Sequence, residues 1–279
     1  MKFLEAKESF LQYYTKKYIF INEQNQTVEF VYVDRPPEHI ICISCMYGCP
    51  IWCGFCKSWT KFFGNLSFED MRVILSYIIE DKKLLTNNPK MVFSFMWSWE
   101  PLMNYENVAL CINKIIEVFP DASLSLATSW VQIQNLLSLA SQINYYPKVQ
   151  LSFHSPFDEE RKKLIPHTTD VKEILETLSR YQSIYKAKIT LNYIVLDDVN
   201  DTLSHVRWIK NILDEYPFSF KINEYHDVRM WYAQSKHRDE FISQLHKEWI
   251  SPKIYDTDWV DIWAACGQLS SEKMGDVLA

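Results

Sequence analysis

Glycine is scarce in this chain, with five residues among 279, although it makes up about 7% of an average protein. None of the strand-like runs is followed by the glycine pattern of a dinucleotide-binding fold or of a P-loop, where glycine lets the backbone approach a phosphate. The scarcity therefore removes the usual support for a Rossmann or P-loop protein.

Long apolar runs and excess positive charge are also missing. No run of 18 apolar residues occurs, and the first residues carry charges instead of a signal-peptide core, so we expect a cytoplasmic protein with no membrane partner. Subtracting 35 acidic from 29 basic residues gives −6, which is not the footprint of a nucleic-acid binder. The short basic runs at 15–17 and 161–163 could line a local groove, but such runs more often face solvent.

Strand-like runs alternate with amphipathic stretches from residue 27 onward. This alternation predicts one α/β domain with a parallel sheet. The expected helices cover residues 67–81 (with a Ser-x-x-Asp capping signal), 106–119, 131–141, 171–185 and 203–216. The expected strands cover residues 27–33, 39–44, 91–96, 122–128, 148–153, 188–196 and 218–223.

Cysteine, in contrast, is concentrated. Of seven cysteines, five fall within 15 residues, and the last three of these have the spacing C-x3-C-x2-C on the loop after the strand at 39–44. Such crowding is not typical of structural disulfides in a cytosolic chain. Three thiolates on one loop can hold an iron–sulfur cluster with one iron left open. Zinc stays an alternative, because Cys45 or Cys42 could supply a fourth ligand.

With this loop, the chain resembles the radical SAM superfamily and, within it, the RlmN/Cfr family of methyltransferases. The resemblance runs from about residue 27 to 270. It rests on the cluster loop, on "WEPLMNYENV", on "LSFHSPFDEERKKLIP", on "YIVLDDVNDTLSHV" and on "DIWAACGQL", which follow in the family's order. It implies a partial (β/α)6 radical SAM barrel over residues 39–279, with a short β-rich N-terminal cap over 1–38.

The resemblance also implies the cofactors, which are a [4Fe–4S] cluster and S-adenosylmethionine. The cluster ligands would be Cys49, Cys53 and Cys56. Contacts to S-adenosylmethionine would come from Trp99, Glu100, Ser129, Ser152, Phe153, His154 and His226. His226 stands where the family has the Asn of an Asn-Pro pair.

Three further residues match the family's catalytic positions. Cys266 corresponds to the methyl-carrying cysteine, Cys42 to the resolving cysteine and Glu29 to the proton acceptor. Taken alone, an apolar-flanked cysteine is usually a core residue and a strand glutamate usually faces solvent. In their matching context, they imply a methyl transfer through S-methylcysteine to an sp2 carbon of adenine in RNA, with a flavodoxin-like electron donor.

Tryptophan, with ten residues, marks the main departure from the family. Five tryptophans replace a family glycine, where the backbone must approach a ligand or adopt a positive φ. These are Trp59, Trp97, Trp99, Trp130 and Trp259, and Trp52 and Trp249 belong to the same group. Either the cofactor pocket has been rebuilt, or UGA codons that mean glycine have been translated as tryptophan. The second hypothesis is the simpler one.

The N-terminal segment is the second departure, because about 40 residues precede the cluster loop and a small RNA-binding domain of typical size needs more. Two alternatives to RNA methylation therefore stay open. One keeps the same radical relay but acts on a small molecule, a nucleoside or a peptide. The other is a non-catalytic iron–sulfur protein whose S-adenosylmethionine pocket is closed.

Overall fold

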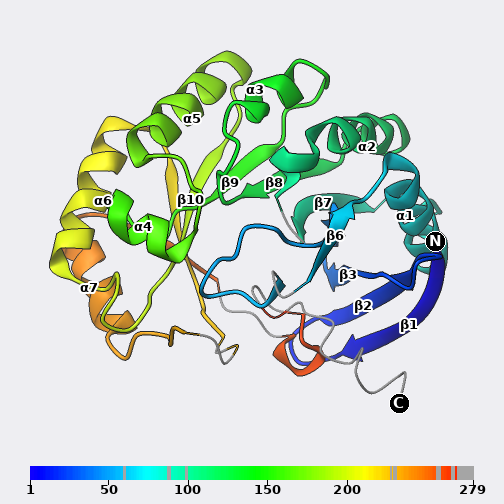
Figure 1. Cartoon of the computed structure of the whole chain (residues 1–279), viewed down its shortest axis with the longest axis horizontal. Helices are drawn as coiled ribbons and strands as arrows, with labels where there is room; N and C mark the ends of the chain where they lie inside the picture. The colour runs from blue at the N-terminus through cyan, green and yellow to red at the C-terminus, as the bar shows by residue number, and fades with distance from the viewer. Residues whose placement is uncertain are drawn as a thin grey trace.

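The computed structural model describes residues 1–58, 61–86, 89–97, 100–226, 228, 231–255, 259–264 and 268. One ten-stranded sheet organises this part of the chain, in the order β1-β2-β3-β4-β7-β8-β9-β10-β11-β12, and a two-stranded sheet, β5-β6, lies apart from it. In Figure 1 the large sheet curls, and the main helices lie along its outer side. The curled sheet leaves its concave face for a site.

The parallel part of the sheet starts at β4 (Glu38–Ser44) and continues through β7 (Lys90–Trp97), β8 (Ser123–Thr128), β9 (Lys148–Ser152), β10 (Ile189–Ile194), β11 (Ser219–Asn223) and β12 (Lys253–Tyr255). The connecting helices are α1 (Phe68–Asp81), α2 (Tyr105–Val118), α3 (Asn135–Ala140), α4 (Asp158–Leu164), α5 (Val171–Tyr185), α6 (Leu203–Glu215) and α7 (Arg238–Lys247). Two 3-10 turns are η2 (Pro101–Asn104) and η3 (Val260–Ile262). This is the predicted partial βα barrel, and its sheet is open.

The N-terminal segment forms an antiparallel meander of β1 (Lys2–Ser9), β2 (Tyr14–Ile21) and β3 (Thr27–Arg35), which continues the sheet across β4. The predicted β-rich cap is thus confirmed, while the domain boundary at residue 38 stays a prediction. Strand β3 is buried on both faces. Val28, Phe30 and Tyr32 join the main core, whereas Val31 and Val33 join a smaller cluster with Cys42.

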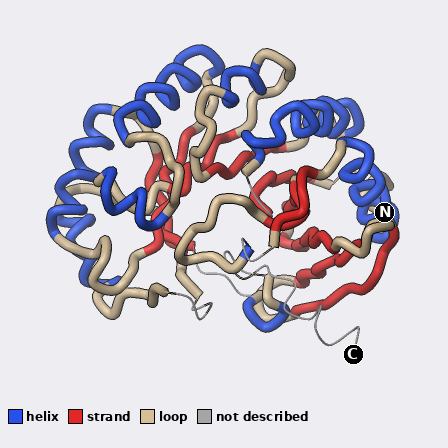
Figure 2. The backbone as a smooth tube through the Cα atoms, viewed as in Figure 1, coloured by secondary structure: helices blue, strands red, loops and turns tan. Residues whose placement is uncertain are grey.

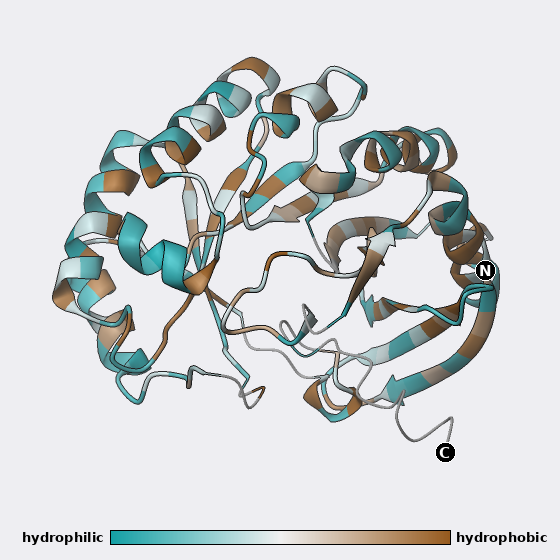
Figure 3. Ribbon diagram, viewed as in Figure 1, coloured by the Kyte–Doolittle hydropathy of each residue, from teal (hydrophilic) through white to brown (hydrophobic). Residues whose placement is uncertain are grey.

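The helices are amphipathic, as the alternating brown and teal segments in Figure 3 show. Helix α5 coincides with the predicted 171–185 because its apolar residues recur at helical spacing, and Ile174, Leu175 and Leu178 are all buried. Figure 2 shows the layering, with helices outside, strands inside and loops crossing the concave side. None of the described helices has the length and apolar character needed to span a bilayer.

The sequence pattern did not predict β1, β2, β12, α4 or α7. Helix α4 carries six charges in seven residues, which hides its short apolar side. The expectation that the basic runs face solvent is wrong for two of their members. Arg161 is fully buried and Lys17 is 2% exposed, because each has polar partners from distant elements, described below.

Candidate active site

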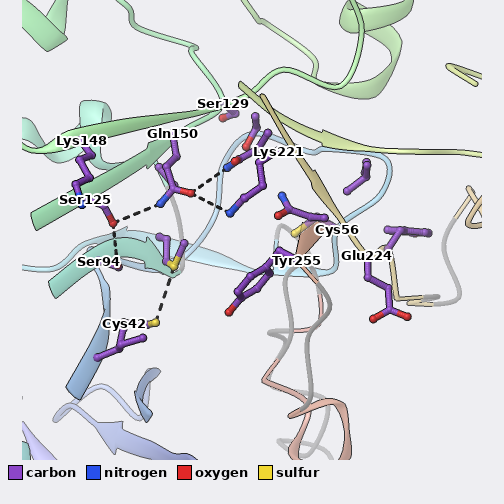
Figure 4. A pocket seen from close by; sticks show the side chains of 18 of the residues that line it. Cys42, Cys56, Ser94, Ser125, Ser129, Lys148, Gln150, Lys221, Glu224 and Tyr255 are labelled. Carbon is purple, nitrogen blue, oxygen red and sulfur yellow. Dashed lines mark hydrogen bonds between the residues drawn. The ribbon is translucent and has the colours of Figure 1, made fainter. Parts of the chain in front are cut away.

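A cavity of about 310 Å³ lies on the concave side of the sheet. It is lined by all three cysteines of the C-x3-C-x2-C loop, and by side chains from β4, β7, β8, β9, β10 and β11. Figure 4 shows Cys42 and Cys56 on its walls, together with residues of several strands. The carboxyl ends of parallel strands are the usual place for a site in this type of fold.

The cysteine loop leaves β5 (Met46–Gly48) and returns in β6 (Phe62–Asn65). Gly48 has φ +82, and a Cβ there would lie 1.6 Å from the carbonyl oxygen of Lys61, so this turn requires glycine. The buried amide of Asn104 donates to the carbonyls of Cys45 and Leu66, at 2.8 Å each. These two bonds fix both ends of the loop.

The three thiols of the loop share one environment. Cys49 and Cys56 are buried and Cys53 is partly exposed. Burial raises the pKa of Cys49 and Cys53 well above the usual range of a thiol, and the nearby thiols of the loop raise it further. All three thiols line the same cavity, where a bound cation would favour their ionised form.

Glu100 lies at the end of β7 with φ +99, an uncommon backbone conformation for a residue with a side chain. Its carboxylate is 1% exposed and accepts four hydrogen bonds. Thr128 and the backbone of Leu102 donate to Oε1, and the hydroxyl and the backbone N–H of Ser129 donate to Oε2 at 2.8 Å each. Burial raises the pKa of Glu100, and these donors act against that rise.

The chain after β8 and the chain after β9 are joined by Arg161. Its Nη1 donates to the carbonyl of Ser152, at 2.7 Å, and to that of Phe153, while its Nη2 donates to the carbonyl of Ser129 at 3.0 Å. Ser129, Ser152 and His154 all line the cavity. Phe153 is fully buried beneath them.

His154 is a neutral imidazole in the cavity wall. It is 4% exposed, and burial, followed by the charge of Arg161, lowers its pKa to about 3. The backbone N–H of Ile194 donates to Nδ1 at 3.2 Å, so the ring proton lies on Nε2. Its ring meets that of Phe55 edge to face, with centroids 4.8 Å apart. His154 thus contacts the cysteine loop and can donate from Nε2.

A row of polar side chains crosses the cavity from strand to strand (Figure 4). Ser94 of β7 and Ser125 of β8 share a hydrogen bond of 2.7 Å, Gln150 of β9 donates to Ser125 at 3.4 Å, and Lys221 of β11 donates to Gln150 at 3.1 Å. Asn192 of β10 also donates to Gln150, at 3.5 Å. Hydrophobic residues usually fill the lumen of such a barrel, whereas this one can bind polar groups.

Cys42 and Glu29 lie on one face of neighbouring strands. Val31 of β3 is paired with Cys42 of β4, and side chains two residues apart in a strand share a face. Cys42 is 4% exposed, with its Sγ 3.9 Å from the Sδ of Met96. Glu29 forms an ion pair with Lys17 at 3.3 Å. Burial raises the pKa of Glu29, while the ammonium of Lys17 lowers it.

The segment that precedes Cys266 packs on this same face. Trp259, Ile262 and Ala264 form a buried cluster with Cys42 and with Val31 and Val33 of β3. Lys17 donates to the carbonyl of Trp263 at 3.0 Å. Residue 264 therefore belongs to the same buried cluster as Cys42, and Cys266 itself lies outside the described residues.

Other predicted residues are placed less directly. His226 does not line the cavity, but its neighbours Glu224 and Tyr225 do, and its Nε2 lies 3.7 Å from Glu224. Its role as a cofactor contact stays a prediction. Trp99 and Trp59 lie outside the described residues.

Comparison with known proteins supports one relationship. No family model matches the chain. It is 27% identical over 270 residues to the "Probable dual-specificity RNA methyltransferase RlmN" of Finegoldia magna, with 93% of this chain and 76% of that protein covered. It is 28% identical over 271 residues to "RlmN 2" of Protochlamydia amoebophila, with 93% and 74% covered. The crystal structure of a radical SAM methyltransferase from Sphaerobacter thermophilus matches with a TM-score of 0.87 at 21% identity, covering 97% of this chain and 81% of that one.

The chain resembles RlmN-type RNA methyltransferases in sequence, and its fold is that of a radical SAM methyltransferase. This resemblance implies a [4Fe–4S] cluster and S-adenosylmethionine as cofactors.

The residues present in this RlmN-like chain fit the cluster. No three His, Cys, Asp or Glu side chains of the described residues converge on a point that would hold a single metal ion. The thiolates of a four-iron cluster bind different irons and need only line one cavity, as the three loop cysteines do.

Sequence reasoning missed four residues of this site: Lys17, Asn104, Thr128 and Arg161. Each makes at least one hydrogen bond to a residue at least 28 positions away. The available signals for Arg161 were the basic run at 161–163 and its place inside the quoted "LSFHSPFDEERKKLIP" stretch.

Proposed function

We propose that this protein methylates an sp2 carbon of adenine in RNA, and that it carries the methyl group on Cys266. The observation that carries the proposal is the packing of residues 259–264 against Cys42. It places residue 264, two positions before Cys266, in the same buried cluster as Cys42, which shares a face with Glu29. The names of the relatives supply the RNA substrate.

The loop cysteines Cys49, Cys53 and Cys56 would hold the cluster, and Glu100, Ser129 and the stretch from Ser152 to His154 would line the S-adenosylmethionine site. Trp99 and His226 stay proposed contacts. When bound, the cluster and S-adenosylmethionine supply the methyl group and a 5′-deoxyadenosyl radical. A flavodoxin-like protein is the proposed electron donor, and the cytoplasm is the proposed place of action because RNA substrates are found there.

Each of the three catalytic residues has one task. The thiolate of Cys266 accepts a methyl group by displacement, and it later holds the base through a thioether bridge after losing hydrogen from that methyl group. The adduct on the base then gives up one electron, which the bound cluster would accept, and the proton of the methylated carbon, which Glu29 accepts. The thiolate of Cys42 then attacks the sulfur of Cys266: the S–S bond of a disulfide forms, the bond from sulfur to the product carbon breaks, and that carbon takes up a proton as the methylated product leaves.

The surroundings of Glu29 support its role as a base. A carboxylate whose pKa is raised by burial holds a proton more tightly than an exposed one, which suits a general base near neutral pH. The ammonium of Lys17 at 3.3 Å acts against this rise. The carboxyl of Glu29 thus has an increased proton affinity and a cation beside it.

The first test uses Cys42→Ala. Without Cys42 the thioether bridge cannot be resolved, so the anaerobically reconstituted variant should accumulate protein crosslinked covalently to RNA, measured by gel shift and by mass spectrometry of nuclease-treated protein. Cys111→Ala is the matched control, because Cys111 is equally buried but lies in α2. It should form no adduct and should turn over normally.

The outcomes separate the alternatives. Adducts that contain only a small molecule, a nucleoside or a peptide would replace RNA as the substrate class and keep the relay. A wild-type protein that binds iron but releases no 5′-deoxyadenosine would be a non-catalytic iron–sulfur protein.

A further inference from the structure

Four tryptophans have a backbone conformation that favours glycine. Their φ values are +67 at Trp52, +74 at Trp130, +62 at Trp249 and +52 at Trp263. They are half of the eight tryptophans whose backbone the structure describes. Only a few per cent of residues other than glycine have a positive φ, and a bulky residue there is an outlier. A positive φ at half of the described tryptophans is therefore far more than chance would give.

Two of these positions end helical turns in the way that glycine does. After α7, the N–H of Trp249 donates to the carbonyl of His246 at 3.0 Å, and that of Ile250 donates to Leu245 at 2.9 Å. This pair of bonds is the Schellman motif, in which the left-handed residue is usually glycine. Trp263 follows η3 and is left-handed in the same way, with its N–H donating to Val260 at 3.0 Å.

Two of the four indole rings gain little from packing that could offset the strain, and a third lacks a hydrogen-bond partner. Trp249 is 93% exposed and Trp52 is 57% exposed, so neither ring gains much from packing. Trp130 is fully buried next to Ser129, and within the described part of the chain its indole N–H has no hydrogen-bond partner. A buried donor without a partner is unfavourable.

We propose that positions 52, 130, 249 and 263 carry glycine in the protein as its own cells make it, because the codon UGA is read there as glycine. The backbone identifies these positions independently of any family resemblance, and Trp263 is added by the structure alone. Trp97 and Trp259 have no positive φ, so the backbone does not mark them as glycine positions. Trp208, in the middle of α6, and Trp231 have no positive φ either, and no family glycine is matched there, so they are expected to be genuine tryptophans.

The test has two arms. Peptide mass spectrometry of the protein purified from its source organism should give glycine masses at the four positions and tryptophan masses at 208 and 231. The gene should have UGA at the four positions. Tryptophan masses, or UGG codons there, would overturn the proposal.

The second arm uses the recombinant protein with the printed sequence. Trp249→Gly removes the strain of a left-handed backbone at a tryptophan and loses no packed ring. The thermal midpoint of this variant should therefore rise by about 2 °C or more. Trp208→Gly is the matched control, since its ring is 49% exposed but it lies inside a helix, where glycine should lower the midpoint. An unchanged or lower midpoint for Trp249→Gly counts against the proposal.

A second inference concerns Arg161 and rests on the proposed function. Its guanidinium is fully buried, and the structure records no ion pair for it in the described residues. Instead it donates to the carbonyls of Ser129, Ser152 and Phe153, and its Nε donates to the hydroxyl of Thr168 at 3.1 Å. A buried cation in a protein is retained only when its donors are satisfied in this way.

We infer that Arg161 is the positioning residue of the S-adenosylmethionine site. It ties the chain after β8, which carries Ser129, to the chain after β9, which carries Ser152 and His154. Without it, the two sides of the cavity would no longer be held at one spacing, and preorganised contacts to the cofactor would be lost. The three loop cysteines should still hold iron, because the hydrogen bonds of Arg161 all go to Ser129, Ser152, Phe153 and Thr168, and its link to Cys53 is through charge alone.

The test compares Arg161→Gln with Arg161→Lys in reconstituted protein. Iron content should stay near the wild-type value in both variants, whereas the dissociation constant for S-adenosylmethionine should rise more than tenfold in Arg161→Gln and less in Arg161→Lys. Thr168→Val removes only the Nε partner and should give a smaller rise, which keeps the test open if Arg161→Gln does not fold.

Equal affinity in wild-type protein and a folded Arg161→Gln variant would overturn the inference. If wild-type protein with a full complement of iron binds no S-adenosylmethionine, the proposed function fails instead. The two failures are therefore distinguishable.

Discussion

At the scale of single residues, His154 connects the cavity to stability. The unfolded chain protonates this histidine below about pH 6.5, while the folded protein keeps it neutral down to about pH 3. Between these values the unfolded state binds more protons, so acid favours unfolding. The stability that its lowered pKa supports is present above pH 6.5 and is lost as the pH falls.

The substitution His154→Asn tests this effect. Asparagine tolerates the φ of +56 at this position and can accept the hydrogen bond from Ile194, but it does not titrate. Below pH 6.5 the wild-type free energy of unfolding should fall more steeply than that of the variant, by up to about 1.4 kcal/mol per pH unit. Urea unfolding at pH 7.0 and 5.5 measures the difference, and parallel pH profiles would contradict it.

At the scale of elements, the cysteine loop depends on the turn that follows β7. Asn104 of η2 donates to the carbonyls at both ends of the β5–β6 hairpin, so the loop is held by an element that follows it in sequence by some 40 residues. Its Oδ1 is held in turn by the amide of Asn107 at 2.8 Å. A loop fixed in this way presents its thiols without having to order on binding.

Asn104→Asp should detach the loop. The change has nearly the same shape, but it places carboxylate oxygens against two carbonyl oxygens in a buried site. We expect the iron content after reconstitution to fall below half of the wild-type value. Asn113→Asp, which changes an exposed asparagine on α2 that also donates to a carbonyl, is the control and should keep its iron. Full iron content in Asn104→Asp would show that the loop does not need this anchor.

At the scale of the whole molecule, Lys17 connects the two ends of the chain. It contacts Glu29 in the N-terminal meander and the carbonyl of Trp263, 246 residues away. Burial lowers its pKa and Glu29 acts against that change. The buried pair therefore holds the segment before Cys266 on the sheet that carries Cys42.

Lys17→Met should destabilise the protein by about 3 kcal/mol, because it leaves Glu29 buried without a cation. The double variant Lys17→Met, Glu29→Gln should lose less than the sum of the two single changes. Lys16→Met is the neighbouring control. Its pair with Asp81 is more exposed, so its removal should cost about 1 kcal/mol or less. Urea midpoints measure all four, and strict additivity would contradict the coupling.

The sequence predicted the parts of this molecule that depend on local pattern. Helix α5 matches its prediction because apolar spacing alone defines it, and the C-x3-C-x2-C loop identifies its own chemistry. Arg161 and Lys17 could not be placed from the sequence, since a charge is buried or exposed according to partners that are far away in the chain. Strands β1 and β2 were missed because the charges along them obscure their alternation.

By itself, the sequence determined which reactive groups exist and in which order they occur: Glu29, Cys42, the three loop cysteines and Cys266. The tertiary structure alone decided that Glu29 and Cys42 share a face and that residues 259–264 pack on it. It also decided the sign of φ at the tryptophans. The reason is physical: strand register and helix termination are set by hydrogen bonds between segments, and a residue's identity does not specify the partner of its backbone.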